Sequence, residues 1–431
     1  MRALAVLIAV ARRAMMSLCR RGLLALVFLF ILIAVPGESL SPEARFEMQV
    51  RMLAAPYRFN LWAWEVQGLA QKAREMFVNP AADLTSSQAV RLVHEYVATA
   101  RQIGEFERRI ERIYASAAEA DPDAATAGLR AQVAMLRQVQ AKRRPMVEAI
   151  LQAQISAVLA DEGLTVLGLV WPPVKFAFSE PPYYLIVSPR ARIELRLGVY
   201  LQSDLPVDQH IALEEQVEAL GDVSALVEGI GGFGSFPTMV IDRAGLDWIL
   251  NTIAHEWTHN YLVFYPLGWN YYSSRDTVTL NETVASIVGD EVGQKALERF
   301  YPELVSLKRT QASQERPLEE KAFDFGREMR ATRLAVDALL AKGYVREAEA
   351  FMEARRRRLV EHGYVIRRLN QAYFAFHGSY ATGPSAVDPI GPKLTKLREA
   401  SPSLAAFLRT AARITSVAEL DAALQRLGAV P

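Results

Sequence analysis

The sequence has little cysteine, little histidine and almost no net charge. Its 431 residues include one cysteine, Cys19, which excludes an intramolecular disulfide and a metal site built from cysteines. Basic and acidic residues nearly cancel, leaving a formal charge of +1, so nothing in the charge balance favours nucleic acid as a partner. Hydrophobic residues make up 51% of the chain, which is typical of a globular protein with a large core.

Long apolar runs are also scarce, and the one that stands out lies near the N-terminus. It extends from Gly22 to Val35, follows Arg20 and Arg21, and no acidic residue precedes Glu38. This asymmetry predicts that the N-terminus stays in the cytoplasm and the rest is moved across the membrane. The run is shorter than the ~20 residues of a spanning helix. Residues 1–37 are therefore expected to be a signal peptide or a single-pass signal anchor, with the folded part extracytoplasmic, exported or tethered to the membrane.

The pattern of apolar residues changes twice along the chain, and these changes predict an α+β, mostly helical fold. Residues 38–163 have apolar residues at helical spacing, with a break expected at Pro145 and an end at Gly163. Residues 164–245 contain short β-rich segments such as YYLIVSP and FPTMVID, with a helix expected within 204–232. Helices follow over 246–298 and in the C-terminal part, 299–431. The longer ones are expected at 246–265, 280–298, 318–342 and 344–376, and a short one at 402–412.

Two of the six histidines stand four residues apart, in TIAHEWTHNY (252–261). On a helix, His255 and His259 lie on one face, one turn apart, and can bind the same ion. Two imidazoles at this spacing suit a tetrahedral Zn²⁺. Glu256 lies about 100° further round the helix, where it could take a proton from a metal-activated water as general base. The alternative is a pair of surface histidines beside a glutamate, which the uncharged flanking residues disfavour.

A catalytic zinc site needs a third protein ligand. The segment TLNETVASIVGDE predicts a second helix, on which Glu282 stands between Asn281 and small apolar residues. We expect Glu282 to be that ligand, with Asp290 and Glu291 as weaker choices two turns further along. An ordinary exposed glutamate at 282 is the alternative.

HEWTH followed by an Asn-Glu pair on a later helix resembles the gluzincin metallopeptidases. The resemblance implies a zincin-like domain over 164–431, with His255, His259 and Glu282 as zinc ligands and Glu256 as the base. The spacing to Glu282 is longer than usual in that family, and YPLGWNYYSSRDTV (265–278) is the expected insertion. Ser286 follows one turn after Glu282, where the family often has an acidic residue that supports a ligand.

A weaker resemblance covers roughly 246–412. The charged helical pair followed by LNQAYFAFHGSYATGPSAVDPIGPKL is similar to a bacterial group of predicted zinc aminopeptidases. It points to Tyr380 as the donor that stabilises the oxyanion, with His377 second. Tyr271 and Tyr272 are weaker candidates from the residues themselves.

The glycine-rich segment GIGGFGSFPTMVID (229–242) leads into the first metal helix. Glycines permit close backbone approach, and gluzincins have an edge strand above the zinc that pairs with substrate backbone. A plain turn is the alternative. Glu228, just before this segment, is a candidate for binding a substrate amine.

Together these patterns predict a zinc metallopeptidase acting on peptide or protein substrates, aminopeptidase-like, with a membrane contact through the N-terminal segment and no nucleic acid. One rival is a noncatalytic, membrane-anchored helical scaffold with a relic or structural metal site. Another is a zinc hydrolase of some other amide or ester.

Overall fold

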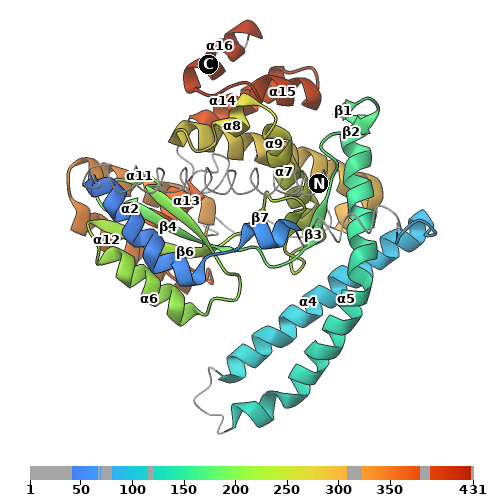
Figure 1. Cartoon of the computed structure of the whole chain (residues 1–431), viewed down its shortest axis with the longest axis horizontal. Helices are drawn as coiled ribbons and strands as arrows, with labels where there is room; N and C mark the ends of the chain where they lie inside the picture. Colours follow the sequence, from blue (N-terminus) through green and yellow to red (C-terminus); the bar gives the residue numbers. More distant parts are fainter. Residues whose placement is uncertain are drawn as a thin grey trace, which may run out of the picture. The chain divides into compact units, whose positions relative to one another are not determined.

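The structure is a computed structural model that describes residues 41–66, 68, 80–114, 121–307, 323–378 and 389–428. The chain forms two compact units, residues 1–50 and 51–431. In the first, the described part is the beginning of helix α2 (Pro42–Ala54), which is followed by a single 3₁₀ turn, η1 (Ala55–Tyr57). The expected α+β, mostly helical fold is confirmed (Figure 1). The domain boundaries expected at residues 37 and 163 stay predictions.

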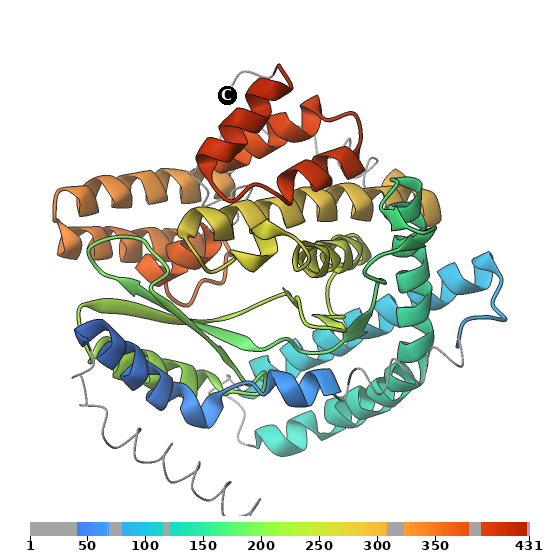
Figure 2. The same ribbon diagram turned by 45° about the horizontal axis from the view of Figure 1, so that its top comes forward.

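Two long helices, α4 (Ser86–Tyr114) and α5 (Pro122–Asp161), pack along each other (Figure 1). The side chain of Asp121 accepts a hydrogen bond from the Ala124 N–H and so caps α5. The break expected at Pro145 is wrong, because α5 continues through this residue and its ribbon only bends along its length (Figure 2). The helix stops before Gly163, whose φ of 76° is the left-handed conformation that ends many helices.

Three small sheets follow α5. The strands are β1 (Thr165–Val166), β2 (Leu169–Val170), β3 (Phe176–Phe178), β4 (Tyr183–Pro189), β5 (Leu197–Leu201), β6 (Val223–Gly229), β7 (Gly232–Phe233) and β8 (Thr238–Val240). One sheet has the antiparallel order β5-β4-β6, and another has the order β3-β8-β7, in which β3 and β8 are parallel. β1 and β2 form a separate hairpin. In the second sheet, β7 is an edge strand.

The helix expected within 204–232 is only half correct. Helix α6 (Val207–Glu218) ends at Glu218, and residues 223–229 form strand β6 beside β4. The sequence VSALVEG is short and mostly buried, a pattern that a helix and a buried strand share. Pairing with β4, which is distant in sequence, decides for the strand.

Helices α7 (Leu246–Leu262) and α9 (Arg275–Phe300) form the most extensive contact between elements and lie at the centre of the largest core, joined by the short α8 (Pro266–Trp269). Their predicted positions are confirmed, although α9 begins a turn earlier than expected. The Ser274 side chain and Thr277 form a capping box that sets this start.

The C-terminal helices are α11 (Phe325–Ala341), α12 (Val345–Glu361), α13 (Gln371–His377), α14 (Ile390–Ala400), α15 (Leu404–Ala411) and α16 (Val417–Arg426). The single helix expected over 344–376 is wrong, because α12 ends before Gly363, which has a φ of 87°. Helices α14 and α15 pack against α9 and so against the metal-site region. Among the described residues no helix combines the length and apolar character needed to cross a bilayer.

Candidate metal centre

Helix α7 presents both histidines to the same point. Residues 248–263 contain no charged side chain other than Glu256 and the histidines, which suits a helix that is buried along most of its length. One turn apart, the Nε2 atoms of His255 and His259 lie 3.1 Å from each other. The imidazoles keep a small exposure, so they are accessible from the cavity described below.

Helix α9 supplies the third ligand atom. Oε2 of Glu282 lies 3.5 Å from Nε2 of His255 and 3.6 Å from Nε2 of His259. The two helices approach closely because Gly289 and Gly293 face α7. A Cβ on Gly293 would lie 2.7 Å from backbone atoms of Asn251. The expected alternative of an exposed glutamate at 282 is wrong, because Glu282 is buried.

The three atoms fit a metal ion, and these residues form a candidate metal-binding group. Ligands about 2.0–2.1 Å from a tetrahedral ion are separated from one another by roughly 3.3 Å, and the three separations here are 3.1, 3.5 and 3.6 Å. Oε2 of Glu282 is also buried without a hydrogen-bond partner in the described structure. A bound cation would satisfy this oxygen, since a buried carboxylate oxygen without a partner is costly.

Neighbouring polar groups orient two of the ligands. Nδ1–H of His259 donates to Oδ1 of Asn281 at 2.8 Å, which leaves Nε2 with the lone pair a metal needs. The Tyr271 hydroxyl donates to Oε1 of Glu282 at 2.5 Å, which leaves Oε2 for the ion. Support for the ligands therefore comes from Asn281 and Tyr271. Ser286 instead donates to the backbone carbonyl of Glu282.

The electrostatics of the triad show that it is suited to hold positive charge. Burial alone would lower the pKa of His259, but the charge of Glu282 outweighs it and raises the pKa to about 9. Burial would likewise raise the pKa of Glu282, but the two histidines bring it well below the usual range. A carboxylate and two imidazoles are thus arranged to share a cation, whether a proton or a metal ion.

The general-base candidate lies beside the triad. Glu256 is buried, and burial raises the pKa of its carboxyl group. Strand β7 passes directly over it. A Cβ on Gly232 would lie 2.2 Å from Oε1 of Glu256, and one on Gly234 would lie 3.5 Å from Oε2. Gly232 and Gly234 therefore permit close approach of an edge strand to α7, and because the segment contains strands β7 and β8 the interpretation of it as a plain turn is wrong.

A cavity of about 520 Å³ joins these groups. It is lined by the metal triad and Glu256, and by aromatic side chains from several elements: Phe59, Tyr184, Tyr200, Phe233, Tyr271, Tyr272 and Phe376. The rings pack together, with Tyr200 4.7 Å from both Tyr184 and Phe233 between ring centroids. Gly198 makes room for this packing, because a Cβ there would collide with the Tyr184 hydroxyl.

Other predicted residues lie elsewhere. His377 ends α13 and is not among the residues that line the cavity. Its ring packs on Tyr373 and Phe376, and burial lowers its pKa to about 4. Tyr380 lies outside the described residues, so its role stays a prediction. Glu228 does not line the cavity either. Burial raises its pKa to about 7, and its charged neighbours are Arg367 and Glu214.

The weaker choices for the third ligand have other partners. Asp290 accepts a hydrogen bond from the Asn251 side chain at 3.1 Å. Glu291 forms ion pairs with Lys295 and Arg398 and joins α9 to α14. Neither residue belongs to the group that could hold the ion.

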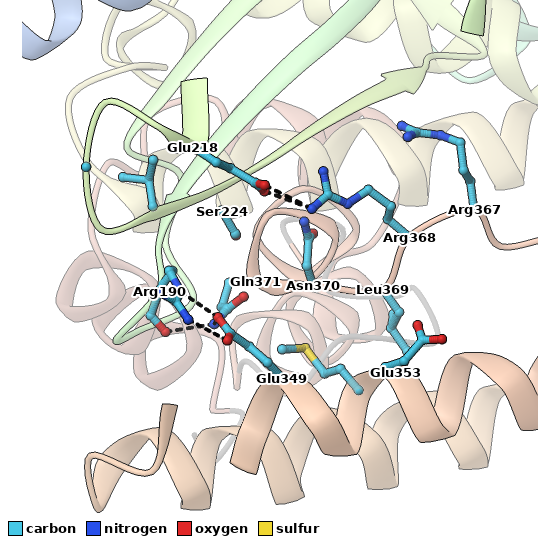
Figure 3. Close-up of a pocket in the computed structure, with 13 residues that line it drawn as sticks. Arg190, Glu218, Ser224, Glu349, Glu353, Arg367, Arg368, Leu369, Asn370 and Gln371 are labelled. Atoms are coloured by element: carbon cyan, nitrogen blue, oxygen red, sulfur yellow. Dashed lines mark hydrogen bonds and ion pairs between the residues drawn. The ribbon is translucent and has the colours of Figure 1, made fainter. Parts of the chain in front are cut away.

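A second cavity, of about 380 Å³, lies next to the segment that carries α13 (Figure 3). Arg190 forms two hydrogen bonds to Glu349, at 2.6 and 2.7 Å, and the Gln371 side chain donates to Glu349 and to the Arg190 carbonyl (Figure 3). Arg368 is paired with Glu218. These pairs tie α12 and the residues at and just before the start of α13 to Arg190, which follows β4, and to the end of α6.

The chain matches no protein-family model, no curated protein and no solved structure. What the site can do is therefore argued from its own atoms.

Sequence reasoning did not predict the hydrogen bonds that orient His259 and Glu282, nor the part of the cavity wall that comes from the strands. Asn281 was noted only as the neighbour of Glu282, although an amide one residue before a ligand is placed to contact the facing helix. Tyr184 and Tyr200 had no signal, because only the pairing of β4 with β5 brings them beside α7 and α9.

Proposed function

We propose that this chain is a zinc-dependent peptidase, exported or held at the membrane by its N-terminal segment, that hydrolyses bonds in peptide or protein substrates. The observation that carries the proposal is the shared cavity. Three ligand atoms with separations near those of a tetrahedral ion, and a buried carboxylate next to them, line the same cavity. Zinc is the ion we propose, because two imidazoles and one carboxylate are a ligand set typical of catalytic zinc.

Zinc bound by the triad would supply a Lewis acid that polarises the scissile carbonyl and makes water more acidic. Glu256 accepts the proton of the attacking water and passes it to the leaving amine nitrogen. Its buried setting favours this role, because a raised pKa brings a carboxylate closer to the proton affinity that a base needs at neutral pH. Asn281 and Tyr271 hold His259 and Glu282 in the orientation the ion requires.

Strand β7 would bind the substrate backbone. It ends the order β3-β8-β7, so in the described part of the chain its outer edge is not paired with another strand. An extended peptide can add to such an edge, and Gly232 brings this edge against Glu256. The scissile bond of a peptide bound here would lie beside the base.

The aromatic wall of the cavity favours substrates with a large apolar side chain near the scissile bond. Tyr200, Phe233 and Phe376 offer ring faces rather than charges. Burying an apolar side chain against them would contribute roughly 25 cal/mol per Å² of surface removed from water. The phenol that stabilises the oxyanion stays a prediction at Tyr380.

The rival scaffold function would not need Glu256. A structural metal site requires ligands but no base, whereas this carboxylate is buried at a cost and adjoins an edge strand. These features support the peptidase proposal over the scaffold.

The test compares the full chain with Glu256→Gln. We expect about one zinc per chain in both proteins by elemental mass spectrometry. Hydrolysis of a quenched-fluorescent peptide library should fall at least ~10²-fold in the variant, because general-base catalysis contributes about that much or more. Glu298→Gln, an exposed position on α9, is the matched control and should keep full activity.

A Glu256→Gln variant as active as the wild type, or a chain that takes up no zinc, would contradict the proposal. Cleavage of esters but not of any peptide would favour the other hydrolase.

A further inference from the structure

The β1–β2 hairpin has an unusual tip. Val166 pairs with Leu169, which leaves Leu167 and Gly168 as the two turn residues, with φ values of 53° and 81°. Such a turn favours Asn-Gly, because an L-residue with a side-chain branch is strained in the left-handed region. Yet the residue here is leucine, and it is 99% exposed. Strained backbone conformations cluster at functional sites, so this exposed apolar tip is a candidate for contact with something outside the chain.

The tip is part of a larger apolar surface. This surface consists of the exposed side chains Val166, Leu167, Leu169 and Trp171 of the hairpin region and Val263, Phe264, Trp269 and Tyr272 after α7. The two segments meet where the rings of Trp171 and Phe264 lie 6.1 Å apart. The Trp257 indole, which donates to the Pro172 carbonyl at 2.7 Å, fixes the base of the hairpin to α7.

Charge is missing from both segments. Residues 164–174 and 260–274 contain no Asp, Glu, Lys or Arg, in a chain that is 23% charged. Three of the four aliphatic residues, Val166, Leu167 and Leu169, stand in the hairpin, whereas Trp171 follows it and Trp269 and Tyr272 lie after α7. Proteins at a bilayer show the same order, with aliphatic side chains deepest and Trp and Tyr at the level of the headgroups.

We propose that this apolar surface inserts into a lipid bilayer, with Leu167 deepest, and is a second membrane contact besides the N-terminal segment. The sequence outside the described residues supports a bilayer as the occupant. The apolar run ends at Val35, and α2 begins at Pro42. The residues between them can span at most about 20 Å, so a run held in the membrane keeps the folded chain beside it.

The proposal has a consequence for the metal cavity. Val263 and Tyr272 belong both to the apolar surface and to the lining of that cavity. Insertion of the surface therefore brings the metal cavity close to the bilayer. Peptides lying at the membrane surface would reach it without first leaving for the bulk solvent.

The experiment uses the full chain with Cys19→Ser and one new cysteine, labelled with an environment-sensitive fluorophore. The label is placed at Leu167→Cys or, in a second variant, at Leu169→Cys. The matched control is Val365→Cys, which is also 99% exposed but lies between α12 and α13. Each protein is reconstituted into vesicles of three parts phosphatidylcholine to one part phosphatidylglycerol. Vesicle-bound protein is isolated by flotation.

We expect a nitroxide on the lipid acyl chains to quench the label at 167 and 169 several-fold more than the label at 365. Adding Leu167→Asn to the Leu169→Cys protein should keep the fold, since Asn-Gly suits the turn, and should reduce that quenching. Equal quenching at all positions, or none, would overturn the proposal. Labels at 167 and 169 shielded from both lipid nitroxide and aqueous iodide would show that a protein surface, such as a second copy of this chain, covers the patch instead. The readout does not depend on zinc or on peptidase activity.

Discussion

Gly232 and Glu256 depend on each other, although they are on different elements. The carboxylate of Glu256 occupies the space that a side chain at 232 would need. A glycine at this point of the edge strand is therefore required by the position of the Glu256 carboxylate and not by the strand itself. The nearby Gly234 has more room, because its nearest neighbour, Cβ of His259, would lie 3.3 Å from an added methyl group.

We expect Gly232→Ala to abolish peptide hydrolysis while zinc content stays near that of the wild type. The new methyl group would displace the Glu256 carboxylate, and a misplaced general base forfeits roughly 10²–10⁴-fold in rate. The measurement pairs initial rates with elemental analysis. Gly229→Ala is the control, since its nearest neighbour, the Tyr183 ring, lies 3.7 Å away, an ordinary contact. Activity retained in the 232 variant would mean that Glu256 is not the base.

Residue-level reasoning found the parts of the site that are local in sequence. His255, Glu256 and His259 share one helix, so their spacing alone places them. Glu282 was found because its flanking residues predict a packed helix. The contacts of Asn281 with His259 and of Tyr271 with Glu282 could not be predicted from the sequence, because each crosses an interhelical contact or a loop.

At the scale of elements, the close packing of α7 and α9 brings together the three residues that could hold a metal ion. Gly289 and Gly293 stand one turn apart on the face of α9 that meets α7. Gly289 allows Asn251 and His255 to approach, and Gly293 allows Asn251 to approach. A wider separation would move Glu282 away from both histidines.

Gly293→Ala is therefore expected to lower the free energy of unfolding by about 1–3 kcal/mol, since overpacking a tight contact costs that much. It should also weaken zinc binding, which competition with a chromophoric chelator would measure. Gly128→Ala on α5 has nothing within 4 Å of the added methyl. It should instead stabilise the chain by roughly 0.5–1 kcal/mol through helix propensity. If both substitutions had the same effect, the packing argument would fail.

The predicted helix within 204–232 was partly wrong because pairing with a strand distant in sequence outweighs the local hydrophobic pattern. Residues 223–229 are apolar enough for either a helix or a strand, and β4 decides for the strand. Pro145 lies within α5, which continues through this residue as a single helix, so the predicted break does not occur. At 223–229 the pairing with β4 supplied what the local sequence did not.

At the scale of the whole molecule, buried and half-buried ion pairs join the helices to the sheet. Glu214 is fully buried and accepts hydrogen bonds from Arg367, Arg368 and the Val227 N–H. Burial would raise its pKa, but these bonds lower it below the usual value. The hydrogen bonds from Arg190 lower the pKa of Glu349 in the same way.

These shifts fix the direction of the pH dependence. A carboxyl group whose pKa is lower in the folded state stabilises the fold above its unfolded pKa, near 4.5, and loses that contribution as the pH falls through the folded pKa. We expect the free energy of urea unfolding to decrease below about pH 4.5. The difference between the wild type and Glu349→Gln should shrink from pH 7 to pH 3. Glu347→Gln, exposed on the same helix, controls for the lost charge. A difference that grew on acidification would contradict this assignment.

The sequence by itself determined the helical elements of strong period, the two histidines with their glutamate, and the choice of Glu282, because each rests on spacing within one or two helices. Only the tertiary structure decided that β7 lies on Glu256, that Asn281 and Tyr271 orient His259 and Glu282, and that the cavity wall is aromatic. The physical reason is the sequence distance between the contacting groups. The residues lining the metal cavity extend from Arg51 to Phe376, and no local sequence pattern predicts that they pack together.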